Sequence, residues 1–487
     1  MSNRAGHVPY DDFTGGEAFI YPASDMKPKY SKLLQNCHVF SDGAVSKIPG
    51  YIKVNSSDVS DGLLSGFEFK QSDGTIIELT AGNGTIYEVL GTGELSAIKT
   101  GLDASAKVYF SQINDLCIMS NGVDAMMKYD GATVSNLGGT PPATGFKSHV
   151  HKNRVWIIER TDKMLATHSA LNAAEDYTTA ADAGYIDFKY VLGRGDELLD
   201  IVTYIDLLVF FFRNHVVIYS GSDPTASGDF AIVQKIEGAG VINSDAIVSY
   251  GSDLAFIYGS GIKSLRQTVT TGSLNIADLS EKIDPDLRAD IAAGGNTSVA
   301  HYPKYGWLAF LINGIVRIYS YTWKAWGRMV GGDILGMFAT ADGALRLCGT
   351  GFLYTYDSGY DFAGTNPVYR WETAHIIISK IAKVYPKIMQ LLAYPLESTT
   401  ASLQTIYDQK DSPAEQYIDF DVTPGSIVYI DAVTDWDALA FIDEVSYTEI
   451  RLPLFGGGNT VQMIFTNTSD KQLSFGAMNL QVVRGGF

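Results

Sequence analysis

Four histidines are the first candidates for chemistry, because histidine is the commonest metal ligand among the side chains. His149 and His151 stand two residues apart in the segment FKSHVHKNR, which places both on one face of an extended strand. His168 and His215 follow in later strand-like segments. A metal site also needs a third ligand and supporting hydrogen bonds. We therefore favour surface or interface histidines over a metal site, and we expect no metal and no other cofactor.

Three pairs of closely spaced carboxylates are the next candidates: DPD at 284–286, DFD at 419–421 and DWD at 435–437. None has the remaining ligands, the Gly and the terminal Glu of a calcium loop. Paired carboxylates also serve glycosidases, but the favoured interpretation places these pairs on the exposed faces of strands. The sequence also lacks GxSxG, P-loop and HExxH motifs. We therefore expect no enzymatic activity.

The elements that would position these residues repeat one pattern: an apolar strand, a turn rich in Gly, Asn or Asp, and a second apolar strand. The pattern occurs seven times, at 75–90, 115–129, 154–168, 206–220, 253–267, 307–320 and 344–357. Its spacing is that of propeller blades, each with four antiparallel strands. An isolated hairpin is only marginally stable in water, so the repeats must share a core. The sequence predicts an all-β protein with a β-propeller of about seven blades over residues 51–365.

The segments on either side of the repeats predict different structures. Residues 1–50 lack the pattern and contain a helix candidate at 27–36, so we expect an N-terminal interaction arm or a segment that closes the propeller. Between two repeats, Asp284 and Pro285 favour a helix start, and Gly294 with Gly295 favour its end. Residues 366–487 show alternating strands without the blade period, and the turn GGGN at 456–459 stands where a hairpin connection would. This region predicts a β-sandwich.

The net charge of −18 argues against non-specific binding to duplex DNA. Residues 411–450 contain no Lys or Arg and carry ten acidic side chains: Asp411, Glu415, Asp419, Asp421, Asp431, Asp435, Asp437, Asp443, Glu444 and Glu449. Residues 147–163 instead carry five Lys or Arg and two acids. Opposed patches of this kind allow copies to dock head to tail, although solvated loops also explain them. The acidic residues are candidates for an interface or for the wall of a channel.

Cysteine use and apolar runs bear on the location of the chain. Cys37, Cys117 and Cys348 are widely spaced and form no CxxC motif. This argues against a disulfide framework or a zinc site and fits a reducing cytoplasm. The N-terminal residues lack the apolar core of a signal peptide, and the longest apolar run, at 207–212, is too short for a membrane helix. We expect a soluble chain without a membrane span.

Three stretches carry the features of one family. The first, NCHVFSDGAVSKIPGY, contains an Asn, a small turn and a basic-x-Pro-Gly-aromatic motif, at Asn36, Gly43, Lys47, Pro49, Gly50 and Tyr51. The second, at 210–265, contains a strand ending in a Y..G phrase, a Gly-rich crossing and a further strand pair. The third, at 316–329, follows a strand with Trp323 and Trp326. In these stretches the chain resembles the tail hub or nozzle proteins, also called packaged-DNA stabilisation proteins, of short-tailed bacteriophages.

The resemblance implies a structural protein of the virion tail, assembled in the host bacterial cytoplasm. Family members form a sixfold ring below the portal and adaptor, and that ring continues the channel through which the genome is retained and ejected. The implied partners are other copies of the chain in a homohexamer, the adaptor (head-to-tail connector) protein, tail fibres or tailspikes, and a tail needle or plug. Duplex DNA would pass through without specific binding. The resemblance does not extend to the C-terminal sandwich.

Two other classes of protein remain as alternatives. One is a carbohydrate-binding or carbohydrate-cleaving propeller that recognises a receptor for a virion tail, and the other is a cellular scaffold. An enzyme of the first kind needs clustered carboxylates or an arginine triad at one end of the blades, which the sequence does not reveal. A scaffold is expected to be monomeric, whereas a tail hub is expected to form a ring.

Overall fold

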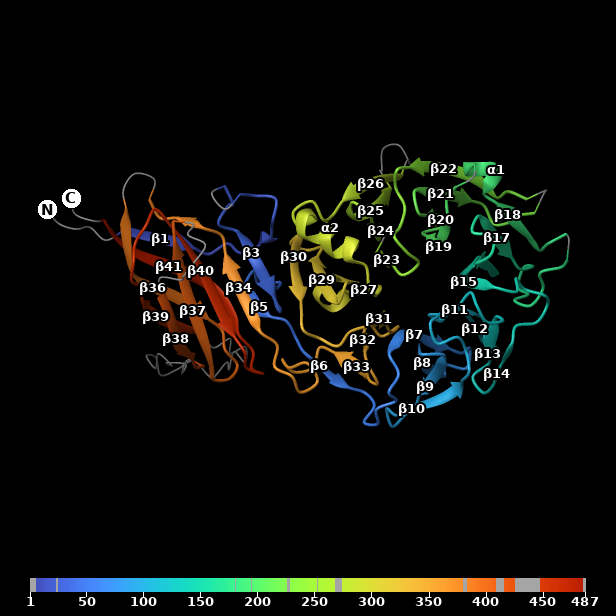
Figure 1. The fold of residues 1–487 in the computed structure, drawn as a ribbon, viewed down its shortest axis with the longest axis horizontal. Coiled ribbons are helices and arrows are strands. Elements are labelled where there is room, and N and C mark those ends of the chain that lie inside the picture. Colours follow the sequence, from blue (N-terminus) through green and yellow to red (C-terminus); the bar gives the residue numbers. More distant parts are fainter. Residues whose placement is uncertain are drawn as a thin grey trace, which may run out of the picture.

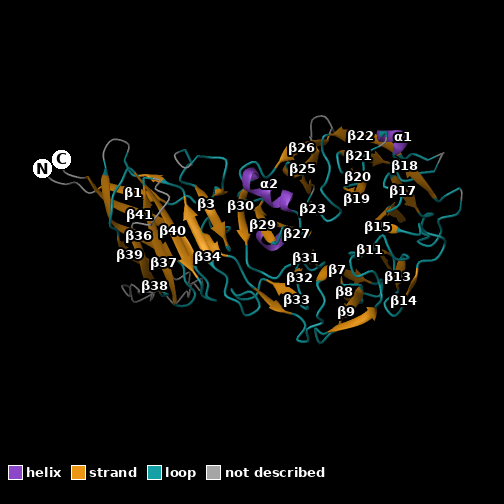
Figure 2. Ribbon diagram, in the orientation of Figure 1, coloured by secondary structure: helices purple, strands orange, loops and turns teal. Residues whose placement is uncertain are grey.

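The computed structural model describes residues 6–22, 25–179, 181–193, 195–225, 228–251, 253–267, 274–379, 383–408, 416–424 and 447–484. The molecule is elongated, with a ring of small sheets at one end and a large β-structure at the other (Figure 1). Strands dominate both parts, and the helices are short (Figure 2). The helices are α1 (Lys189–Leu192), α2 (Asp284–Ala293) and the 3-10 turn η1 (Pro303–Tyr305).

Six separate four-stranded sheets form propeller blades around the ring. The first three contain β7 (Leu63–Lys70), β8 (Ile76–Gly82), β9 (Thr85–Val89) and β10 (Leu95–Lys99); β11 (Tyr109–Ile113), β12 (Leu116–Ser120), β13 (Met127–Tyr129) and β14 (Val134–Asn136); and β15 (Gly145–His151), β16 (Arg154–Glu159), β17 (Leu165–His168) and β18 (Gly184–Asp187). The next two contain β19 (Leu198–Tyr204), β20 (Leu207–Phe212), β21 (His215–Ser220) and β22 (Ala231–Glu237); and β23 (Ile247–Tyr250), β24 (Asp253–Tyr258), β25 (Gly261–Gln267) and β26 (Leu274–Asp278). The sixth contains β31 (Gly336–Ala339), β32 (Leu345–Cys348), β33 (Leu353–Tyr356) and β6 (Tyr51–Lys53).

All seven predicted hairpins are present as antiparallel strand pairs. Six of them lie in the separate sheets, which confirms the β-propeller. The remaining hairpin belongs to four consecutive strands, β27 (Thr297–Tyr302), β28 (Trp307–Ile312), β29 (Ile315–Ser320) and β30 (Ala325–Met329). These four strands have the order of a blade but form one end of an 11-stranded sheet.

Strand β20 illustrates how the blades share a core. Its sequence LLVFFF is buried from the second residue onward, and successive side chains of a strand point to opposite faces. Leu208, Phe210 and Phe212 pack in the cluster that includes Trp156 of the preceding blade. Val209 and Phe211 instead pack in the cluster with β24 of the following blade. A continuous apolar strand is therefore needed wherever a sheet lies between two others.

The ring is closed by a strand from its N-terminal side. In the sixth sheet, β6 pairs antiparallel with β33, with Tyr51 opposite Tyr356. The ring of Tyr51 also stacks on that of Phe362, with 5.0 Å between the ring centroids. Residues more than 300 positions apart in the chain thus complete one blade, with β6 as its outer strand.

The C-terminal strands and the N-terminal segment form a second β-structure together. The 11-stranded sheet continues from β30 through β3 (Tyr30–Gln35), β34 (Tyr369–Thr373), β40 (Thr460–Asn467), β37 (Thr399–Tyr407) and β38 (Gln416–Val422), with β2 (Gly16–Glu17) and β35 (Ile376–Ile377) at its side. A six-stranded sheet contains β39 (Thr448–Pro453), β36 (Val384–Ala393), β41 (Ser474–Arg484), β5 (Val45–Lys47), β4 (Cys37–Val39) and β1 (Gly6–Tyr10). Both contribute to one apolar core. The strands for which a β-sandwich is expected thus form a large, nearly closed, barrel-like arrangement.

Of three local predictions from the sequence, two helices and one hairpin, the structure confirms one and contradicts two. Helix α2 begins at Asp284 and ends before Gly294, as predicted. The helix predicted at 27–36 is wrong, because residues 30–35 form β3, which pairs with β2 and β34. Strand pairing across the whole chain outweighs local helix propensity there. The hairpin expected at 456–459 is also wrong, because β39 pairs with β36 whereas β40 pairs with β34 and β37.

None of the helices in the described ranges is long and apolar enough to cross a membrane.

Candidate functional site

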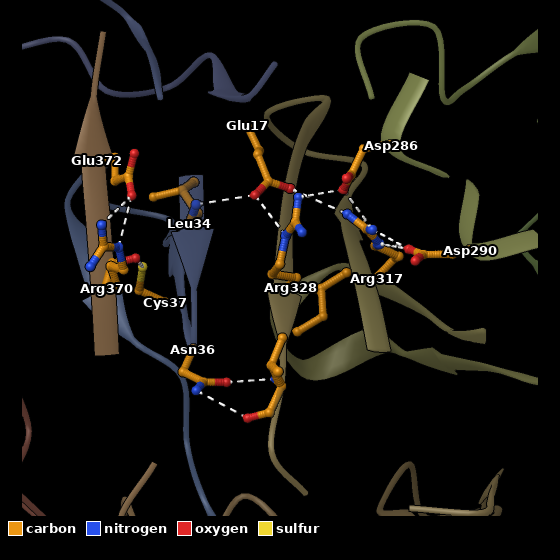
Figure 3. A network of polar contacts seen from close by, with 12 residues as sticks. Glu17, Leu34, Asn36, Cys37, Asp286, Asp290, Arg317, Arg328, Arg370 and Glu372 are labelled. Atoms are coloured by element: carbon orange, nitrogen blue, oxygen red, sulfur yellow. Dashed lines mark hydrogen bonds and ion pairs between the residues drawn. The ribbon is translucent and has the colours of Figure 1, made fainter. Parts of the chain in front are cut away.

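A buried ion-pair network joins the propeller to the C-terminal sheets (Figure 3). Glu17, on β2, is completely buried. Its Oε1 accepts hydrogen bonds from Nε of Arg328, at 2.8 Å, and from the backbone N–H of Leu34, at 3.3 Å. Arg328 lies on β30 and Leu34 on β3, so one carboxylate connects three strands from both halves of the molecule.

Helix α2 supplies the other carboxylates of the network. Asp286 accepts hydrogen bonds from Nη2 of Arg328, at 2.8 Å, and from Nη2 of Arg317, at 2.7 Å. Asp290 accepts from Nε of Arg317 at 3.1 Å. Because residues four apart lie on the same face of a helix, both carboxylates point toward strands β29 and β30. The network therefore fixes α2 and β2 against the same blade-like strands.

Burial of the network acts on the pKa values of two of its carboxyl groups, because it removes their charges from water. Burial raises the pKa of Glu17, against the opposing effect of Arg328 and Arg317. Burial opposes the ionisation of Asp286 too, but Arg328 and Arg317 hold its pKa below the ordinary value. Glu17 Oε2 and Arg317 Nη1 are 3.8 Å apart, and among the described residues neither atom has a hydrogen-bond partner. Breaking one pair would leave a buried charge uncompensated. The network is therefore stable only when β2, β29, β30 and α2 are all in place.

Asn36 makes a second polar connection between the propeller and the C-terminal sheets, a boundary here called the junction. Its backbone φ is 55°, in the left-handed region that Asn tolerates better than most residues. Its side-chain amide donates to the carbonyls of Val330, at 3.2 Å, and Val368, at 2.9 Å. Its Oδ1 accepts from the N–H of Val330 at 2.8 Å. One family-motif residue thus ties the end of β30 to the segment that leads into β34.

The other motif residues lie near this junction and near the closing strand. Lys47 is buried and donates to the carbonyl of Ser469, and burial lowers its pKa to about 8. Pro49 is buried, and the N–H of Gly50 donates to the carbonyl of Gly359 at 2.8 Å, just before Tyr51 in the closing strand. Gly43, with φ 82°, forms the turn between β4 and β5. These residues hold the N-terminal segment between the two parts of the molecule.

The two tryptophans of the motif are hydrogen-bonded rather than exposed. Trp323 donates from Nε1 to the carbonyl of Phe40 at 2.7 Å. Trp326 is completely buried and donates to the carbonyl of Leu279 at 2.9 Å. The first contact joins the strand pair β29–β30 to the N-terminal segment, and the second joins it to the segment before α2. Both contacts have a structural role at the junction.

The acidic candidates are only partly within the described ranges. Asp411, Glu415, Asp431, Asp435, Asp437, Asp443 and Glu444 lie outside them. Asp419 and Asp421 are exposed on β38 and accept from Ser402 Oγ, at 2.7 Å, and Thr400 Oγ1, at 3.0 Å. Glu449, on β39, pairs with Arg451 at 2.9 Å. The described members thus lie on outer strands of the C-terminal sheets, away from the junction.

The carboxylates at 284–286 do not follow the interpretation from sequence. That interpretation places them on the exposed face of a strand, whereas Asp284 and Asp286 begin α2. Asp286 enters the buried network, and Asp284 accepts from Ser280 and pairs with Arg288. The exposed-strand interpretation is wrong for this pair, because Asp followed by Pro also favours the start of a helix.

The four histidines do not converge on one site. His149 Nε2 and His151 Nδ1 both lie within hydrogen-bond distance of Thr203 Oγ1, at 2.8 and 3.0 Å. Burial lowers the pKa of His149 to about 3 and that of His151 to about 4, so both rings are neutral near pH 7. His168 packs on Trp156, and His215 contacts Asp196. Within the described ranges, no cluster of three or more His, Cys, Asp or Glu side chains is arranged to hold a metal.

Four members of the network, Glu17, Asp290, Arg317 and Arg328, are not among the candidate residues predicted from the sequence. One signal was available for Arg317, because it interrupts the apolar segment IVRIYS of a predicted blade strand. A charged residue in a strand buried on both faces must find a partner. Its partners could not be identified, because they come from segments about 30 and 300 residues away.

Comparisons with known proteins identify no family for this chain. No family model matches the sequence, and no curated protein matches it. Solved structures that resemble the chain include a streptogramin B lyase, at 13% identity and a TM-score of 0.43, covering 63% of this chain and 96% of that one. The WD40 β-propeller domain of Doa1 matches at 10% identity and a TM-score of 0.41, covering 64% of this chain and 96% of that one. At such values the likeness concerns the fold alone.

Proposed function

We propose that the protein is a structural subunit of a phage tail, a hub or nozzle that assembles head to tail into a ring, most simply of six copies. The observation that carries the proposal is a pair of exposed tyrosines at each end of the elongated molecule. Head-to-tail contacts between unlike surfaces generate closed rings when the rotation between neighbours closes. In this proposal the protein acts without catalysis, and the ring lies below the adaptor and surrounds the path of the genome.

The first of these surfaces, here called the propeller end, lies around α1, β18 and β22. Tyr190 is 91% exposed, Tyr185 67% and Val233 52%. Lys235 of β22 donates to the carbonyl of Val191 at 3.0 Å, so α1 and β22 are neighbours. Strand β22 is also an edge strand of its blade, with backbone groups available for pairing.

The second surface, here called the barrel end, lies at the opposite side of the molecule, on β38 and near β39. Tyr417 is 57% exposed and Tyr447 63% exposed. Both β38 and β39 are edge strands of their sheets. The exposed carboxylates of Asp419 and Asp421 lie on the same strand as Tyr417. Tyrosine is enriched at protein interfaces, whereas aspartate is depleted there, so the two tyrosines are the interface candidates at this end.

A closed ring also requires a fixed geometry between the two ends. The 11-stranded sheet continues from β27 to β38, with β30 and β3 joined through one residue pair, Gln35 and Arg328. The network around Glu17 joins the same two parts. We count the strands β27–β30 as the seventh blade and treat the C-terminal arrangement as a closed form of a β-sandwich. Under this proposal the junction sets the angle between successive subunits, and the family-motif residues serve that purpose.

Negative-stain imaging of the purified protein, alone and with virion tails, tests the proposal. Two double variants remove one surface each: Tyr185→Ser with Tyr190→Ser at the propeller end, and Tyr417→Ser with Tyr447→Ser at the barrel end. Each variant should fail to form rings, whereas a mixture of the two should form dimers through the remaining intact ends. Ile76→Ser, which changes a side chain 55% exposed on β8, is the matched control and should leave rings intact.

Two results would contradict the proposal. The first is a protein that stays monomeric both alone and with virion tails. The second is a set of virions of normal composition that lack this protein. Cross-linking in intact virions tests the accompanying proposals. These are contact with an adaptor, with fibres or tailspikes and with a needle or plug, and passage of DNA without specific binding.

A further inference from the structure

The central cavity of the propeller has the composition of a binding site. It has a volume of about 530 Å³ and is lined by residues from the first strands of the blades, including Leu64, Tyr109, Phe146, Leu199 and Thr297. These strands lie around the axis of the ring. Small-molecule sites commonly occupy about 300–1,000 Å³. A polar ligand of one to three rings is therefore of suitable size for this cavity.

A connected set of buried groups forms the wall of this cavity. The hydroxyl of Tyr109 lies 2.6 Å from Ser244 Oγ and donates to Asp245 Oδ2 at 3.2 Å. Asp245 also pairs with Lys107 at 2.8 Å. The ammonium of Lys147 lies over the ring of Tyr109 and pairs with Asp200, which is buried, at 2.7 Å. The wall is therefore held in place before any ligand arrives.

Arg160 differs from the other cations of the cavity. Lys107 pairs with Asp245, and Arg213 pairs with Glu197 at 2.8 Å. The guanidinium of Arg160 instead lies over the ring of Phe146, 4.9 Å from its centroid, and has no carboxylate partner within the described ranges. It is also exposed. An arginine that is oriented by an aromatic ring and free of a counter-ion is suited to bind a carboxylate.

The remaining polar groups of the lining favour a ligand with hydroxyl groups. The side-chain amides of Asn243 and Asn296 line the same cavity. Among the described residues, neither the Asn243 amide nitrogen nor the Asn296 side chain has a hydrogen-bond partner. An amide can both donate to and accept from a hydroxyl group. The Lys107–Asp245 pair offers a further donor and acceptor beside them.

We propose that the central cavity of the propeller binds an acidic saccharide, with its carboxylate on Arg160 and its hydroxyl groups on Asn243 and Asn296. The proposal concerns binding only and involves no covalent step. The saccharide proposal does not depend on the assembly of subunits into a ring, because every group of the proposed site belongs to one subunit. A saccharide with a carboxylate satisfies both the unpaired cation and the free amides, which neither a simple anion nor a neutral sugar does.

Titration calorimetry with the full chain tests this proposal, using digalacturonate as the probe. Neutral digalactose and inorganic phosphate are the comparison ligands, and both should bind at least about tenfold more weakly. Arg160→Gln should weaken the binding of digalacturonate by about tenfold or more, and Arg160→Lys should weaken it less. Arg451→Gln is the matched control, because Arg451 is a similarly exposed arginine at the far end of the molecule. It should leave binding unchanged.

Three outcomes with the native protein would overturn the proposal: no binding of digalacturonate, equal binding of phosphate, or equal binding of the neutral sugar. Equal affinity in Arg160→Gln would overturn it as well. Thermal unfolding of each variant shows whether it is folded, and Asn243→Ala provides a second variant if Arg160→Gln does not fold. Asn243→Ala should weaken digalacturonate binding but not phosphate binding, because only the saccharide has hydroxyl groups for the amide.

Discussion

The Oε1 atom of Glu17 lies 2.8 Å from Nε of Arg328, although 311 residues separate the two in the chain. Both side chains are buried, and Glu17 has no exposed surface at all. Two charges are removed from water at the boundary between the propeller and the C-terminal sheets. Such a pair contributes little net stability compared with an apolar pair, but it is costly to break from one side. Its presence makes docking of the two parts specific.

Arg328→Met should destabilise the protein by about 3–5 kcal/mol, because it leaves the buried carboxylate of Glu17 without its closest partner. Urea unfolding at pH 7 measures the change. Arg451→Met is the matched control: Arg451 pairs with Glu449, and both side chains are exposed, at 68% and 48%, so its loss should cost about 0–1 kcal/mol. The double variant Glu17→Gln with Arg328→Met should recover part of the loss. Equal losses in both single arginine variants would contradict the role of burial.

Asn36→Ala should destabilise the protein by about 2–4 kcal/mol, because it removes three hydrogen bonds and places Ala at a positive φ. Asn36→Gly separates the two causes, since glycine adopts this φ without strain but makes none of the bonds. Chemical denaturation of both variants measures the difference. If the glycine variant were as stable as the native protein, the hydrogen bonds to Val330 and Val368 would have no net effect.

Gly50→Ala should impair closure of the propeller, because a Cβ at this position would overlap the carbonyl oxygen of Asp361. Overpacking of this kind typically costs about 1–3 kcal/mol. Gly91→Ala is the control, since a Cβ there would have no atom within 4 Å. Hydrogen exchange of β6 and β33 is the more specific measurement, and it should become faster only in the first variant. Unchanged exchange in Gly50→Ala would show that the closing segment can shift without cost.

The stability of the protein should depend on pH through Asp200. Burial raises the pKa of this carboxyl from 3.8 to about 6, against the opposing effect of Lys147. Between about pH 4 and 6 the folded protein keeps a proton that the unfolded chain has lost. The contribution of Asp200 to stability therefore falls as the pH rises through this window, by about 3 kcal/mol in total, and is constant above it.

Asp200→Asn tests this dependence, because asparagine does not titrate. The difference in unfolding free energy between the native protein and this variant should change between pH 4 and pH 7, with the native protein losing stability relative to the variant. Asp206→Asn, at a side chain 80% exposed, is the control and should show no such change. Parallel stability curves for the native protein and Asp200→Asn would contradict the raised pKa.

Much of the propeller could be predicted from the sequence because its blades are built from local hairpins. The pattern of apolar strands and Gly or Asn turns predicts every one of the seven hairpins, from β8–β9 to β32–β33. The helix start at Asp284 is likewise a local signal. Strand period, turn residues and helix caps depend only on residues close together in the chain. They can therefore be recognised without knowledge of the fold.

The tertiary structure alone decided how distant segments meet. The segment 30–35 has local features of a helix, yet it forms β3 because β34 and β2 offer it backbone partners. Strand β6 completes a blade with β33, and Glu17 finds Arg328 across 311 residues. Each of these contacts depends on which strands become neighbours once the whole chain is folded. Sequence periodicity shows that a strand has a buried face or that an arginine is buried. It does not show which residue packs on that face or pairs with that arginine, because the partner is fixed only by the packing of the complete chain.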